Sequence, residues 1–221
     1  MSKIAGQKIV VIGGNGWLGS TAVKAALAHH AKVTILSRHA GASTGVASAV
    51  QGSITDVEAV RDAVKGAQGI VISVEANRTQ EQLHAVYVQG TRNVLEAAPE
   101  KAHIIFMGHI GITHIERMPD YNPAKLMAEE LIRNSGRTYT IIRPSWVVSS
   151  EEGQRGVKLE QGDLYTGRRD DIGSSNLGVC IAAAFESPEA HGKTFELYGG
   201  DVRTPNWSEE FARLKPDAPS L

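Results

Sequence analysis

The stretch Lys8–Gly19, KIVVIGGNGWLG, contains three patterns in succession. Its first five residues form a β-branched apolar run, which is typical of a strand buried on both faces. Glycines follow at positions 13, 14, 16 and 19, and helical spacing of apolar residues begins at Leu18. Strand, glycine turn and helix together favour a bound pyrophosphate, because glycines let the backbone approach phosphate oxygens and a helix N-terminus attracts anions. The alternative is a structural turn, which also uses glycine.

Strand and helix patterns alternate from residue 8 to residue 144. We expect strands over 8–13, 31–37, 46–51, 69–74, 103–107 and 138–143, and helices over 17–29, 55–65, 79–98 and 123–135. This alternation predicts right-handed βαβ units, and therefore an α/β fold with a parallel sheet and helices on both faces. Ligands of such sheets bind beyond the carboxyl ends of the strands.

After residue 144 the pattern loosens, with a helix expected over 177–185 and a strand over 193–197. We interpret residues 1–221 as a single domain in which 145–221 supply substrate-side loops and closing elements.

Thr79-x-x-Gln82 is a candidate cap for the helix expected over 79–98, and two further helix starts have capping signals. Thr55-x-x-Glu58 is a capping-box pattern, and Asn122-Pro123 resembles an N-cap followed by proline at the first helical position. The second signal predicts that Tyr121 lies just before its helix.

Composition excludes several classes of function. The net charge of −1 over 221 residues gives no sign of a nucleic-acid or membrane surface. A single cysteine, Cys180, excludes an intrachain disulfide and fits a reducing compartment. The eight histidines are scattered without metal-ligand spacing. We therefore expect a cytoplasmic monomer or homodimer that acts on a small molecule, without a metal and without nucleic-acid or membrane partners.

The glycine spacing Gly13-x-x-Gly16-x-x-Gly19 resembles the extended and atypical branch of the short-chain dehydrogenase/reductase superfamily. VQGTRNVLEAA at 88–98 resembles the corresponding helix of the extended family. LMAEELIRNSG at 126–136, followed by TYTIIRP at 138–144, is similar to the group that includes NmrA-like and biliverdin-IXβ-reductase-like proteins. The resemblance implies a Rossmann-type doubly wound sheet, strand order 3-2-1-4-5-6, and a bound nicotinamide dinucleotide.

The end of the second expected strand bears on which dinucleotide is bound. An acidic residue there would hold the ribose hydroxyls of NAD, but Ser37-Arg38-His39 contains no carboxylate. The guanidinium of Arg38 can pair with a 2′-phosphate and stack on adenine, which favours NADP(H). The alternative is that Arg38 is a solvated cation at the end of a strand.

The resemblance implies further contacts with the dinucleotide. Gly52-Ser53-Ile54 resembles the segment that lines the adenine, with Ser53 in place of the usual aspartate, and Val74-Glu75 ends the fourth strand where the backbone passes the dinucleotide. The residues predicted to contact the cofactor are Gly13, Asn15, Gly16, Trp17, Leu18, Gly19, Ser37, Arg38, His39, Gly52, Ser53, Ile54, Val74, Glu75, Lys125 and Pro144.

Tyr121-x-x-x-Lys125 matches the Tyr-x-x-x-Lys motif of the same superfamily. Residues four apart on a helix share a face, and a nearby ammonium lowers the pKa of a phenol. The resemblance implies that Tyr121 exchanges a proton with the substrate, and that Lys125 tunes Tyr121 and holds the nicotinamide ribose. The alternative role for Tyr121 is to pack the rim of a binding cleft.

One expected residue is absent, because the fifth expected strand is followed by Gly108-His109 where the superfamily usually has two serines. The expected serine hydrogen-bonds the substrate carbonyl, so His109 or Thr113 is the candidate replacement donor.

Together these features predict an NADPH-dependent oxidoreductase that transfers hydride to a small carbonyl, quinone-like or flavin-like compound. One alternative is a non-catalytic, redox-sensing regulator of the NmrA type that binds NADP(H). Another is an epimerase or isomerase that retains its dinucleotide.

Overall fold

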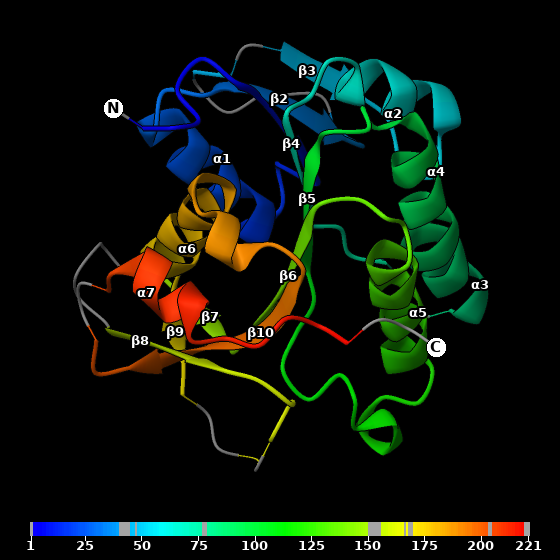
Figure 1. Ribbon diagram of the computed structural model, residues 1–221. Helices are drawn as coiled ribbons and strands as arrows, with labels where there is room; N and C mark the ends of the chain where they lie inside the picture. The colour runs from blue at the N-terminus through cyan, green and yellow to red at the C-terminus, as the bar shows by residue number, and fades with distance from the viewer. Residues whose placement is uncertain are drawn as a thin grey trace.

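The computed structural model describes residues 2–39, 45–46, 48–76, 79–149, 156–165, 167, 170–202 and 205–218 (Figure 1). An eight-stranded sheet runs through its centre in the order β3-β2-β1-β4-β5-β6-β10-β8. The strands are β1 (Lys8–Ile12), β2 (Lys32–Ser37), β3 (Ser48–Gln51), β4 (Gly69–Ile72), β5 (His103–Met107), β6 (Tyr139–Pro144), β8 (Gly156–Glu160) and β10 (Lys193–Gly200). Neighbours are parallel except β8, which is antiparallel to β10.

The first six strands of this order confirm the predicted 3-2-1-4-5-6 arrangement. The strand expected over 193–197 is present as β10 and extends the sheet beyond β6. β8 was not predicted, and neither was the small parallel pair formed by β7 (Val147–Val148) and β9 (Ile172–Gly173).

Helices cover both faces of the sheet (Figure 1). On one face lie α1 (Trp17–Ala28), α6 (Ser174–Glu186) and α7 (Trp207–Ala212), and on the other lie α2 (Val57–Val64), α3 (Gln80–Leu83), α4 (Gly90–Ala97) and α5 (Tyr121–Arg133). Two short 3₁₀ segments, η2 (Ile115–Arg117) and η3 (Pro188–Ala190), are also present. None of the helices found there has the length and apolarity needed to cross a membrane.

Strand β1 shows why the central strands are apolar throughout. Ile9 and Val11 pack into the cluster with α1 and α6, whereas Val10 and Ile12 pack into the cluster with α2 and α4. Successive side chains of a strand point to opposite faces, and here both faces are covered. Each fully buried Val or Ile side chain stabilises the fold by about 1.5–3 kcal/mol.

The helical run over 79–98 was predicted as one helix, and it begins at the expected cap, Thr79, whose hydroxyl accepts from the Gln82 N–H at 3.4 Å. Between α3 and α4 it contains a six-residue π-helical segment, η1 (His84–Gln89). Such segments widen the helix by one residue and occur often at functional sites. This segment contains Tyr87.

Two predicted helix starts were wrong by one or two residues. Asp56, not Thr55, caps α2, because its carboxylate accepts from the N–H groups of Glu58 and Ala59, both at 3.1 Å. Helix α5 begins at Tyr121 rather than after Asn122.

Asn122 does not cap α5 because its side chain binds elsewhere. Its Nδ2 donates to the backbone carbonyls of Gly111 and His114, each at 3.1 Å. Pro123 then occupies the third helical position, where the backbone N–H would have no partner within the helix. As a result Tyr121 and Lys125 lie one turn apart on the same helix.

Candidate active site

A cavity of about 370 Å³ opens at the carboxyl ends of the central strands. It is lined by residues at or after the ends of β1, β2, β3, β4 and β5, by the start of α1, by one residue of η1 and by one residue of α5. The lining residues are Ile12, Gly13, Asn15, Gly16, Trp17, Leu18, Leu36, Ser37, Arg38, His39, Gly52, Ser53, Ile54, Ser73, Val74, Glu75, Val86, Met107 and Lys125.

Most of these lining residues were predicted from the sequence. Gly19, Pro144, Tyr121 and His109 were also predicted for the site but are not among the residues that line the cavity. Five lining residues were not predicted: Ile12, Leu36, Ser73, Val86 and Met107. Four of these five are apolar, so the sequence showed them only as parts of strands or helices.

The glycine loop turns into α1 through tight backbone contacts. Gly13 has φ of +85°, and a β-carbon there would collide with the carbonyl oxygen of Ser73. A β-carbon at Gly19 would collide with the carbonyl oxygen of Gly13. Gly16 is the N-cap of α1 and supplies no side-chain cap. The first N–H groups of the helix are therefore available at the cavity as hydrogen-bond donors for an anion. This is the arrangement that binds phosphate.

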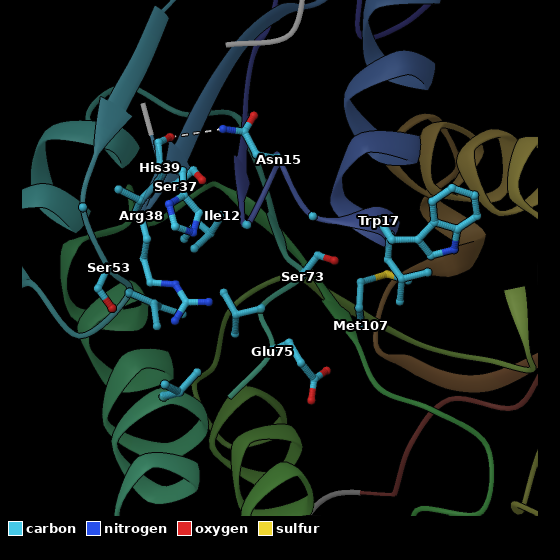
Figure 2. A pocket seen from close by; sticks show the side chains of 18 of the residues that line it. Ile12, Asn15, Trp17, Ser37, Arg38, His39, Ser53, Ser73, Glu75 and Met107 are labelled. Carbon is cyan, nitrogen blue, oxygen red and sulfur yellow. Dashed lines mark hydrogen bonds between the residues drawn. The ribbon is translucent and has the colours of Figure 1, made fainter. Parts of the chain in front are cut away.

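The two sides of the cavity differ in chemistry. Figure 2 shows Arg38 and Ser53 on one side, Trp17 and Met107 on the other, and Glu75 between them. Arg38 and Trp17 are both exposed. Among the lining residues in the described part of the chain, Glu75 is the only carboxylate.

Asn15 links the glycine loop to the end of β2. Its Nδ2 donates to the carbonyl oxygen of His39 at 3.3 Å, as the dashed line in Figure 2 shows. This bond holds the segment that carries Arg38 beside the loop.

Tyr121 and Lys125 lie together at the start of α5. The Lys125 ammonium nitrogen is 5.3 Å from the centroid of the Tyr121 ring and 5.2 Å from that of Tyr87. Burial lowers the pKa of Lys125, while the charges of Glu75 and Glu129 oppose that shift. A lysine that is buried beside a phenol can both bind a ribose hydroxyl and stabilise phenolate.

Glu75 contacts both tyrosines through its carboxylate. The Tyr121 hydroxyl lies 2.8 Å from Oε1 and 3.0 Å from Oε2, and the Tyr87 hydroxyl donates to Oε1 at 3.2 Å. The Tyr87 hydroxyl also lies 3.0 Å from that of Tyr121. Burial, and then the neighbouring Tyr121 and Glu75, raise the pKa of Tyr87.

Tyr87 is a site residue that the sequence did not indicate. It occurred within an apolar stripe at helical spacing, which predicts only core packing. Glu75 was expected for its backbone position, and nothing in the sequence indicated that its carboxylate binds Tyr121.

His109 lies near Tyr121, with 5.5 Å between their ring centroids, and its Nε2 is 3.1 Å from Oδ1 of Asn122. Because Nδ2 of Asn122 already donates to two carbonyls, Oδ1 is the acceptor and Nε2 of His109 carries the proton. Burial and the Lys125 charge lower the pKa of His109 to about 4. His109 is therefore a neutral ring at pH 7.

Thr113 has other partners. Both its N–H and its hydroxyl bind Oδ2 of Asp163 at 2.8 Å, and the Gly111 N–H binds Oδ1. Asp163 is 2% exposed and fixes the loop after β5. The hydroxyl of Thr113 therefore stabilises this loop instead of pointing into the cavity as a replacement for the missing serine.

Comparison with known proteins agrees with this geometry. A family model described as NAD(P)H-binding matches residues 13–188. A protein from Bacillus halodurans with the provisional description NAD-dependent epimerase/dehydratase has a TM-score of 0.80 at 17% identity, covering 95% of this chain and 100% of its own.

Two further solved structures are similar. One is ChuY, an anaerobillin reductase from Escherichia coli O157:H7, with a TM-score of 0.70 at 17% identity, covering 90% of this chain and 100% of its own. The other is a short-chain dehydrogenase/reductase of the wide type from Veillonella parvula in complex with NADP, with a TM-score of 0.68 at 13% identity, covering 90% and 99%. These likenesses confirm the predicted Rossmann-type fold, and the match to the family model shows that the chain belongs to the NAD(P)H-binding family.

Proposed function

We propose that the protein is an NADPH-dependent oxidoreductase that reduces a small carbonyl, quinone-like or flavin-like compound. The observation that carries this proposal is the meeting of two features in one cavity. The glycine loop and Arg38 line one part of the cavity. Lys125 lines another part, and its ammonium nitrogen is 5.3 Å from the centroid of the Tyr121 ring.

The chemistry of the cavity fits a dinucleotide with a 2′-phosphate. The uncapped start of α1 suits the pyrophosphate, and Figure 2 shows Arg38 and Ser53 on one side of the cavity, where none of the described lining residues is a carboxylate. Glu75, the carboxylate that does line the cavity, binds Tyr121 instead. NADP is also the ligand of the Veillonella parvula protein of similar fold.

When bound, the nicotinamide supplies the hydride, and the chain supplies placement and the proton. The Tyr121 hydroxyl donates that proton to the oxygen of the substrate, and the Lys125 ammonium favours the charge left on the phenol. Ser73 is a further hydroxyl in the cavity, so we assign it as a donor to the substrate in place of the absent strand-five serine.

The test is NADPH consumption over a panel of carbonyls, quinones and flavins, with wild type compared with Tyr121→Phe. We expect turnover of at least one class, reduced about 100-fold or more in the variant while NADPH still binds. Equal rates for the two proteins would show that Tyr121 is not the donor.

A second candidate, the redox-sensing regulator, is favoured by the engagement of the Tyr121 hydroxyl with Glu75. Tight NADPH binding without turnover of any compound in the panel would select it. A reduced nicotinamide that stays bound throughout purification would instead favour the epimerase or isomerase.

A further inference from the structure

We propose that Glu75 is the proton relay of Tyr121, through which a proton passes from solvent to the Tyr121 hydroxyl. The inference rests on the proposed function, because it assumes that Tyr121 is the proton donor. Glu75 acts through Tyr121 and is therefore a positioning residue. The pair Tyr121 and Lys125 is thereby extended to a cluster of four, the Glu75 cluster, which consists of Glu75, Tyr87, Tyr121 and Lys125.

The hydrogen bonds of the cluster converge on the carboxylate. Tyr121 reaches both of its oxygens, at 2.8 and 3.0 Å, and Tyr87 reaches Oε1 at 3.2 Å. Each hydroxyl has one proton to donate, so the proton of Tyr121 lies toward Glu75 in this arrangement. A direct path for proton exchange therefore joins Glu75 to Tyr121.

Burial distinguishes Glu75 from its partners. Tyr87 is 1% exposed and Lys125 is 6% exposed, whereas Glu75 is an exposed residue and Tyr121 is half-buried. Of the four residues, Glu75 is thus the most exposed to water. Lys125 lies next to the rings of Tyr87 and Tyr121 and has less access to water than Glu75.

Electrostatics disfavour a charged carboxylate beside the phenolate that forms during turnover. When the O–H bond of Tyr121 breaks and its proton goes to the substrate oxygen, the phenolate that remains would face a carboxylate at hydrogen-bond distance. Two adjacent negative charges disfavour each other. In the proposed relay a proton from solvent adds to an oxygen of Glu75, and this new O–H bond breaks as the O–H bond of Tyr121 re-forms. The starting arrangement is thus restored without any other reactant.

Of the described titratable groups around Tyr121, Glu75 is the one that suits the role of relay. Among the described residues, the titratable groups that face Tyr121 are Glu75 after β4, Tyr87 from η1, Lys125 from α5 and His109 after β5. The Nε2 proton of His109 binds Asn122, and Tyr87 is fully buried. Glu75 alone of these four combines contact with the hydroxyl and exposure to water.

The first test needs no turnover. Phenolate absorbance is followed through an alkaline titration in wild type and in Glu75→Gln, each with and without Tyr121→Phe, so that the difference isolates Tyr121. Without the carboxylate but with Lys125 present, we expect Tyr121 to ionise about one pH unit lower. Tyr87→Phe, which keeps Glu75, is the matched control, and it should shift the ionisation of Tyr121 less. An unchanged titration in Glu75→Gln overturns the proposal.

The second test is the pH profile of steady-state NADPH oxidation. Glu75→Gln keeps the size of the side chain and an acceptor oxygen but cannot carry the proton. We expect about a tenfold or greater loss of kcat with KM for NADPH changed less than about threefold, and a flattened pH profile. We further expect Glu75→Asp to retain part of the rate, and added acetate to restore part of the rate in Glu75→Ala.

A wild-type pH profile and rate in Glu75→Gln would overturn the relay while leaving the proposed function intact. If wild type reduces nothing in the panel, the proposed function fails. The alkaline titration then decides separately whether Glu75 controls the proton of Tyr121.

Discussion

The carbonyl oxygen of Ser73, just after β4, occupies the space that a side chain at Gly13 would need. The end of β4 and the glycine loop therefore pack backbone against backbone, and both residues line the cavity. Gly13 also has φ of +85°, which other residues adopt at a cost.

Gly13→Ala should combine backbone strain with a collision. We expect the free energy of unfolding to fall by about 2 kcal/mol or more, with a loss of NADPH affinity, since the loop must move. Urea unfolding and dinucleotide titration measure the two effects. Gly66→Ala is the matched control, because Gly66 has φ of +70° and nothing lies within 4 Å of its would-be β-carbon. In that variant the free energy of unfolding should fall by the backbone strain alone, about 1–2 kcal/mol. Equal losses in both variants would show that the contact with Ser73 is unimportant.

The sheet and the glycine loop could be predicted because their signals are local. Four apolar residues in a row, Ile9 to Ile12, require cover on both faces, and the resemblance then supplies the strand order. β8 has no comparable signal, since only its pairing with β10 makes Gly156–Glu160 a strand.

The site could be predicted less fully because its side chains choose partners far away in the sequence. Asn122 is a good capping residue, yet it binds the carbonyls of Gly111 and His114 instead. Tyr87 follows helical spacing, but the π-helical segment directs its hydroxyl to Glu75, which lies before that helix. Competition between local and tertiary partners cannot be read from spacing alone.

Arg38 should distinguish the two dinucleotides. Arg38→Ala removes a charge-assisted contact with the 2′-phosphate, so we expect NADPH to bind about 10- to 100-fold more weakly and NADH to change little. Fluorescence titration with both cofactors measures this. Arg92→Ala, an exposed arginine on α4 that does not line the cavity, is the control. Equal weakening of both cofactors by Arg38→Ala would mean that Arg38 does not recognise the 2′-phosphate.

The half-buried ring of His109 should make stability depend on pH. Its pKa is lowered from 6.5 to about 4 in the folded chain, so below pH 6.5 the unfolded chain binds the proton first. The free energy of unfolding should therefore fall as the pH drops from 6.5 to 4, by at most about 3 kcal/mol from this residue.

His109→Gln should flatten that part of the stability profile, measured by urea unfolding at several pH values. His84→Gln, at an exposed position on η1, is the surface control and should leave the slope unchanged. A slope that is the same in His109→Gln and wild type would contradict burial of a neutral ring.

Arg143 binds two buried carboxylates, and one of them, Glu129, lies on α5 with Lys125. It donates to Glu129 at 2.7 and 3.1 Å and to Glu196 at 3.0 Å, and both carboxylates are 1% exposed or less. Burial raises the pKa of Glu196, while the Arg143 charge opposes that shift. Arg143→Met keeps the volume but leaves Glu196 without this cation and Glu129 with Arg133, at 2.7 Å, as its partner, so we expect a loss of about 3–5 kcal/mol at pH 7.

The loss should shrink in acid. Burial raises the folded pKa of Glu196 above its unfolded value near 4.5. Below that pH the carboxyl is neutral in both the folded and the unfolded state. It destabilises the fold as the pH rises through the folded pKa. Urea unfolding from pH 4 to pH 8 measures this trend, with Arg61→Met as the control. The pair of Arg61 with Glu58 has 59% and 75% exposed side chains, so its loss should cost less than about 1 kcal/mol. If Arg143→Met were no more costly than Arg61→Met, the buried pair would not hold α5, and with it Lys125, against the sheet.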